Sequence, residues 1–111
     1  MAGTDEWGMD PTVSAMRKIF RAMDDSQREF FNRMEIHRYD PRIRPWREKA
    51  LVLFEKAFSH AGRAGVSFNE DTASIIYLHC LAEVMRAQGI DVPYINLSDK
   101  AGVEDVLKEI L

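Results

Sequence analysis

The stretch Ala73–Ala87, with the sequence ASIIYLHCLAEVMRA, is apolar on nearly every face and decides the fold of this chain. Its only polar residues are Ser74, His79, Glu83 and Arg86. A helix on a protein surface has one apolar stripe and one wet face. This stretch has two apolar stripes, one containing Ala73, Ile76, Tyr77, Cys80, Leu81 and Val84 and the other Ile75, Leu78, Ala82 and Met85. Both stripes need cover, so we expect residues 70–88 to be the central helix of a bundle or to lie at a subunit interface.

The composition is that of one soluble globular domain. The chain has 111 residues, of which 46% are hydrophobic and 30% charged, and its formal net charge is −3 at pH 7. This hydrophobic content excludes the disordered class, and the net charge gives no general attraction to nucleic acid or to acidic membranes. We expect residues 1–10 to form a flexible tail and residues 11–111 to form a single helical domain.

The expected location is the cytoplasm. Cys80 is the only cysteine, so no disulfide can form within the chain, which suits a reducing compartment. The N-terminal residues are acidic and lack the apolar region of a signal peptide. No run approaches the ~18 apolar residues that a membrane span needs, so we expect no contact with a membrane.

The first helix is predicted over residues 11–37. Asp10 and Pro11 form a good helix start, because an acidic N-cap accepts amide hydrogens and proline suits the first turn. Apolar or neutral residues then recur at helical spacing at Met16, Phe20, Met23, Gln27, Phe30 and Met34. However, Ser26 and Glu29 form a second capping pattern, so a break near residues 24–26 is the alternative to one continuous helix.

Prolines and glycines set the remaining boundaries. Pro41 and Pro45 disfavour regular helix over residues 38–45, and the next helix is predicted over 46–61, ended by Gly62 and Gly65. The N-cap of the central helix is Ser67 or Asn69. After the central helix, Gly89 can take the left-handed backbone conformation that ends a helix, which lets Ile90 pack back onto Met85. Ser98 caps a last helix whose apolar face contains Val103, Val106, Leu107, Ile110 and Leu111.

No segment alternates polar and apolar residues between hairpin turns, so we expect no sheet. The predicted fold class is all-α, a compact four- or five-helix bundle around the central helix. Leftover apolar surface on such a small domain favours at least a dimer.

The sequence carries no motif for catalysis or for a cofactor. His79 and Glu83 have the i, i+4 spacing of a helical metal site, but the same residues with Arg86 form the wet stripe of the central helix. Cys80 lies in an apolar helix, where cysteine usually acts as a small hydrophobic residue. Acidic pairs such as Asp24-Asp25 stabilise helix starts. We therefore expect no metal, no cofactor and no enzymatic activity.

Residues 38–49, which we call the basic-aromatic segment, are the best candidate binding surface. The residues expected to touch a partner are Arg38, Tyr39, Arg42, Arg44, Trp46 and Arg47. Arginine, tyrosine and tryptophan are enriched at protein–protein hot spots. Two alternatives stay open: the arginines pair with nearby acids while Trp46 packs beneath the segment, or the segment binds RNA or a phosphorylated ligand.

These features predict a small non-enzymatic interaction or accessory protein that self-associates and binds an unidentified protein. Nucleic acid is not the expected partner, because the central helix has only one basic residue, Arg86, where a DNA-reading helix needs several. One alternative is a helical sensor that binds a small apolar ligand between its helices, in a closed pocket of at least ~300 Å³. A third is a metal-dependent or other enzyme that uses His79 and Glu83.

Overall fold

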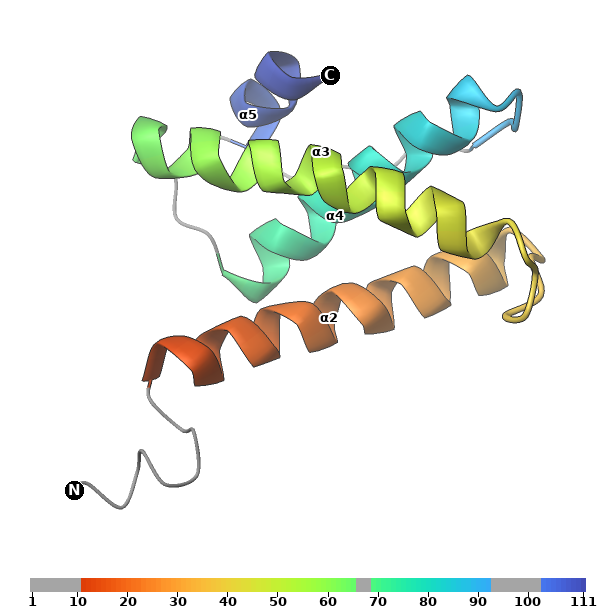
Figure 1. Ribbon diagram of the computed structural model, residues 1–111, viewed down its shortest axis with the longest axis horizontal. Helices are drawn as coiled ribbons and strands as arrows, with labels where there is room; N and C mark the ends of the chain where they lie inside the picture. The colour runs from red at the N-terminus through yellow and green to blue at the C-terminus, as the bar shows by residue number, and fades with distance from the viewer. Residues whose placement is uncertain (1–10, 66–68, 93–102) are drawn as a thin grey trace.

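The computed structural model describes residues 11–65, 69–92 and 103–111, and in these residues it is all-α. Three main helices pack together and a short one follows: α2 (Pro11–Arg33), α3 (Ile43–Ala64), α4 (Glu70–Ala87) and α5 (Val103–Ile110) (Figure 1). The described residues contain no strand, as the sequence predicts. None of these helices is both long and apolar enough to cross a membrane. Residues 1–10, for which we expect a flexible tail, lie outside the described part.

Helix α4 contacts each of the other three helices. It packs mainly against α2 and α3, crosses α3, and also touches α5 (Figure 1). Its side chains at Ile76, Leu81 and Met85 are fully buried, so both apolar stripes of the sequence contribute to the core. Asn69 is the N-cap, because its Oδ1 accepts the backbone N–H of Thr72 at 2.9 Å. The alternative cap, Ser67, lies outside the described residues.

Helix α2 is continuous from Pro11 to Arg33, with no break at residues 24–26. Asp24 and Asp25, which the sequence suggests stabilise a helix start, therefore lie inside a helix. The helix ends before the predicted residue 37, in two hydrogen bonds that close its last turn. Glu35 donates its N–H to the carbonyl of Asn32 at 3.1 Å, and Ile36 donates to that of Phe31 at 2.9 Å. Glu35 takes a left-handed φ of 58°, which makes this a Schellman closure without glycine.

The same closure ends α4, where the sequence predicts it. Gly89 has a φ of 83° and donates its N–H to the carbonyl of Arg86 at 2.9 Å. Ile90 donates to the carbonyl of Met85 at 3.1 Å, and its side chain packs against the core. The glycine at this position supplies the left-handed conformation without steric cost.

Helix α3 is longer at both ends than the predicted helix 46–61. It begins at Ile43, so Pro45 lies within the first turn, where a backbone N–H has no partner in the helix. Proline is tolerated there, and the expectation that residues 38–45 contain no helix is wrong for the last three. The helix also runs through Gly62 to Ala64. It ends at Gly65, whose φ is 73° and whose N–H donates to the carbonyl of Ala61.

Aromatic side chains connect the helices inside the core. The Phe31 ring lies 6.2 Å from the Trp46 ring, which joins the end of α2 to the start of α3. Phe54 meets Tyr77 edge-on at 6.3 Å between α3 and α4. Such pairs prefer tilted or edge-to-face arrangements. The end of α2 and the start of α3 are thus held together under the turn that joins them.

Candidate functional site

The turn between α2 and α3 presents Arg38 and Tyr39 at its tip. Asp40 donates its N–H to the carbonyl of His37 at 2.9 Å, and Tyr39 donates its N–H to His37 Nδ1 at 3.1 Å. The Arg38 guanidinium lies 4.9 Å from the centre of the Tyr39 ring, which is a cation–π distance. Tyr39 is 74% exposed. Both residues therefore face solvent on a turn fixed by its own hydrogen bonds.

Asp40 organises the start of α3. Its carboxylate accepts the backbone N–H of Arg42 at 2.9 Å and a guanidinium N–H of the same residue at 2.7 Å. The hydrogen bond from the Arg42 side chain, and then that from its backbone, lower the pKa of Asp40 from 3.8 to about 2. The carboxylate therefore stays ionised and keeps Arg42 in place at neutral pH.

Trp46 lies beneath the basic-aromatic segment and not on its surface. The ring is 4% exposed, and the Arg42 guanidinium covers it at 5.0 Å from the ring centre. Arg44 points away from the body of the protein, with its side chain 90% exposed and its Nε 3.8 Å from Glu48. Of the six predicted partner-binding residues, Trp46 thus supports the others from within the core.

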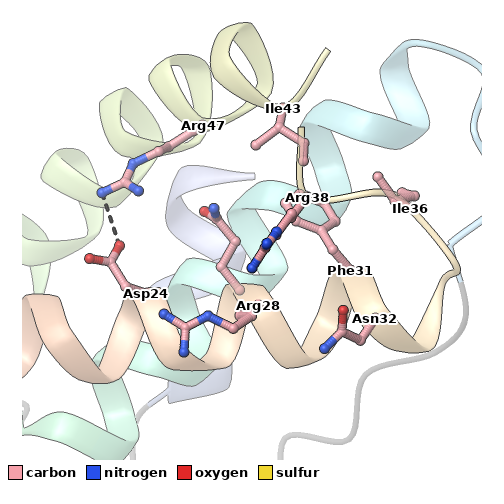
Figure 2. Close-up of a pocket in the computed structure, with 9 residues that line it drawn as sticks. Asp24, Arg28, Phe31, Asn32, Ile36, Arg38, Ile43 and Arg47 are labelled. Atoms are coloured by element: carbon pink, nitrogen blue, oxygen red, sulfur yellow. Dashed lines mark ion pairs between the residues drawn. The ribbon is translucent and has the colours of Figure 1, made fainter. Parts of the chain in front are cut away.

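A pocket of about 290 Å³ opens beside the segment, between α2, the turn and α3 (Figure 2). We call it the arginine pocket. Its lining residues are Asp24, Gln27, Arg28, Phe31, Asn32, Ile36, Arg38, Ile43 and Arg47. Arg47 crosses from α3 to α2, where it forms an ion pair with Asp24 at 3.0 Å. The pocket thus joins two predicted residues, Arg38 and Arg47, to residues of α2 that the sequence did not indicate.

The rim of the pocket is rich in hydrogen-bond donors and its floor is apolar. Three guanidinium groups and one carboxylate give the lining a formal charge of +2. Arg28 forms an exposed ion pair with Asp25 at 3.6 Å, whereas Arg38 has no ion pair within the described part of the chain. The floor is formed by Phe31, which is buried, with Ile36 and Ile43, which are partly buried. This arrangement suits an anion attached to an apolar group.

Gln27 links the pocket to the core. The buried hydroxyl of Tyr77 donates a hydrogen bond to Gln27 Oε1. Burial raises the pKa of Tyr77 to about 12, so the hydroxyl keeps its proton at neutral pH. Gln27 thus ties the lining of the pocket to the buried Tyr77.

The residues considered for metal binding or catalysis do not form a cluster in the described ranges. His79 is partly buried on α4 and Glu83 is exposed one turn later. No group of three or more histidine, cysteine, aspartate or glutamate side chains with metal-binding geometry occurs in the part that the structure describes. Cys80 is buried, and burial raises the pKa of its thiol to about 12, so the thiol is protonated at neutral pH.

Two other hollows are open to solvent. One, of about 510 Å³, lies between α2 and α4 and has Asp25, Glu70 and Asp71 on its rim. The other, of about 190 Å³, lies between α3 and α4 near Leu53 and Val84. The comparisons with known proteins add no assignment for any of these sites, because no family model, no curated protein and no solved structure matches the chain.

Proposed function

We propose that this chain is a small cytoplasmic, non-enzymatic interaction or accessory protein that binds an acidic segment of a partner protein at the arginine pocket. The observation that carries the proposal is that Arg28, Arg38 and Arg47 line one pocket together with apolar residues. These side chains come from α2, the turn and α3, so they meet only in the folded protein. Guanidinium groups bind carboxylates through paired hydrogen bonds.

The distribution of charge supports an acidic partner. The whole chain has a net charge of −3, while the pocket lining has a charge of +2. Interactions between exposed charges are screened beyond about 8 Å at physiological ionic strength. A partner segment in the pocket therefore interacts with the arginines far more strongly than with the acidic residues elsewhere. Complementary charges of this kind set partner choice more than they set affinity.

The pocket is held in shape before a partner arrives. The Asp24–Arg47 ion pair fixes one side, and Arg42 between Asp40 and Trp46 fixes the turn beside it. A surface that is already ordered loses less conformational entropy on binding. The exposed Tyr39 ring adds a large apolar contact next to the rim.

The test is affinity capture with the full-length chain, followed by quantitative mass spectrometry. The pocket variant carries Arg28→Glu and Arg38→Glu. The control variant carries Arg33→Glu and Arg63→Glu, which reverse the same number of charges at exposed positions outside the pocket. We expect a protein that the wild type and the control variant capture and the pocket variant does not. Equal capture by all three chains would show that the pocket does not bind the partner.

A further inference from the structure

The arginine pocket has the charge and the hydrogen-bond donors of a phosphate site. We infer, on the basis of the proposed function, that the acidic group that the pocket binds is the phosphate of a phosphorylated side chain on a partner protein. A phosphate monoester carries a charge of about −1.5 to −2 at pH 7, whereas a carboxylate carries −1. The lining has a charge of +2. Once Arg28 leaves its 3.6 Å contact with Asp25, a phosphate monoester comes closest to neutralising this lining.

The number of donors also favours phosphate over a carboxylate. The rim has three guanidinium groups together with the side-chain amides of Gln27 and Asn32, against the single carboxylate of Asp24. A phosphate monoester offers three strong acceptor oxygens and a carboxylate offers two. The wider spread of oxygens can reach donors from both helices and from the turn.

Arg38 is placed to be the anchor of this site. Figure 2 shows the Arg38 side chain reaching from the turn toward α2, while Arg28 runs along α2 and Arg47 reaches sideways to Asp24. Among the described residues Arg38 stacks on Tyr39 and has no ion pair, so its guanidinium gives up no carboxylate when a ligand binds. Arg28 gives up only a long, exposed contact with Asp25 at 3.6 Å.

The surroundings favour a protein as the source of the phosphate. Phe31, Ile36 and Ile43 form an apolar floor that the residues next to a phosphorylated side chain can cover. Single-stranded RNA is held by bases stacked on exposed aromatic rings. Here the rings of Phe31 and Trp46 are buried, which leaves Tyr39 as the exposed aromatic residue of the basic-aromatic segment, and the net charge of −3 opposes a long polyanion.

The experiment is an NMR titration of the full-length chain with a short peptide that carries one phosphoserine between two leucines. Matched peptides carry serine or glutamate in its place. We expect the phosphopeptide to shift the arginine Nε–H signals and the Ile36 and Ile43 methyl signals. Because its second pKa is near 6, the phosphopeptide should bind more tightly as the pH rises from about 5 to about 7. The glutamate peptide should show no such change over this range.

Single substitutions locate the site. Arg38→Gln and Arg28→Gln should each weaken binding of the phosphopeptide by about tenfold, the cost of losing one hydrogen bond to a charged group. Arg33→Gln is the matched control, because Arg33 is also on α2, also exposed and also paired with an acid, but outside the pocket. It should leave the affinity unchanged. Melting temperatures of all three variants verify that the fold is retained.

The outcomes separate this inference from the function on which it rests. If the glutamate peptide binds as tightly as the phosphopeptide and the binding needs Arg38, the phosphate inference is wrong and the acidic-partner proposal stands. If inorganic phosphate or a short single-stranded RNA binds more tightly than the phosphopeptide with the same arginine dependence, the assignment to a protein side chain is overturned. If affinity capture does not depend on the pocket arginines, the proposed function itself is rejected.

Discussion

At Glu35 the backbone has a φ of 58°, in the left-handed region that glycine adopts freely. A side chain in this region costs about 1–2 kcal/mol. The two hydrogen bonds that close α2 and the packing of Ile36 onto the core offset this cost. Glu35 directly precedes the turn that carries Arg38. Its backbone conformation therefore sets the direction in which the chain leaves α2 and places Arg38 beside the pocket.

Replacing Glu35 with glycine should therefore stabilise the protein. Removing the side chain relieves the strain, while the greater freedom of glycine in the unfolded chain returns part of the gain, which leaves about 0.5–1 kcal/mol. Denaturant unfolding measures the difference. The matched control is Gly89→Ala, at the same position of the same motif on α4, with a φ of 83° and open space around the added carbon. It should destabilise the fold, and a destabilising Glu35→Gly would contradict the argument.

A second prediction at this scale concerns Asp40. Its pKa is lowered from 3.8 to about 2 by Arg42, so the pair stabilises the folded state above pH 3.8, and the contribution is lost as the pH falls through about 2. NMR titration of the carboxyl carbon should give this low value in the wild type. In Arg42→Gln the pKa should move toward 3.8, since the main hydrogen bond is gone. An unchanged value would mean that the backbone N–H alone lowers it.

At the scale of the elements, α4 is the helix on which the others pack, and the sequence predicts it because burial on two sides leaves a pattern in the residues themselves. The closure at Gly89 is equally visible, since only glycine fits there easily. The start of α3 at Ile43 is not visible, because a proline in the first turn gives the same signal as a proline before it. The end of α2 is not visible either, because Glu35 occupies the left-handed position where a glycine usually marks the end of a helix.

The candidate site follows the same division. The sequence indicates Arg38 and Arg47 because basic and aromatic residues are dense around them. It cannot indicate Arg28, which lies on a different helix and comes close only when the turn brings the start of α3 beside the end of α2. Nor can it separate the exposed Tyr39 from the buried Trp46, because both residue types occur at surfaces and in cores. Residue types are readable in a sequence, but distances between helices are not.

The central position of α4 predicts the cost of opening a cavity in it. Leu81 is fully buried, so Leu81→Ala should destabilise the fold by about 2–5 kcal/mol. Leu78→Ala, on the same helix and only partly buried, is the control and should cost less. Denaturant melts of both variants give the comparison. A loss under about 1 kcal/mol at Leu81 would mean that the core around it is loosely packed.

At the scale of the whole molecule, apolar side chains remain on the surface. Phe20 is 42% exposed on α2, and Val52 is 56% exposed on α3. We therefore retain the prediction that the protein self-associates, because a contact between two copies is the commonest way to cover such residues. Light scattering at micromolar concentration should give the mass of a dimer. A monomer mass that persists as the concentration rises would contradict it.

The way α2 is attached has a consequence for local stability. Its backbone runs close to α4, and at the pocket end its side chains also reach α3, from Asp24 to Arg47 and from Phe31 to Trp46. Amide hydrogens exchange with solvent fastest where a helix can open without unfolding the rest. Exchange should therefore begin in the first half of α2 and be slowest in α4. A ligand in the arginine pocket touches both α2 and α3, so its binding should slow exchange along α2, well beyond the residues that it contacts.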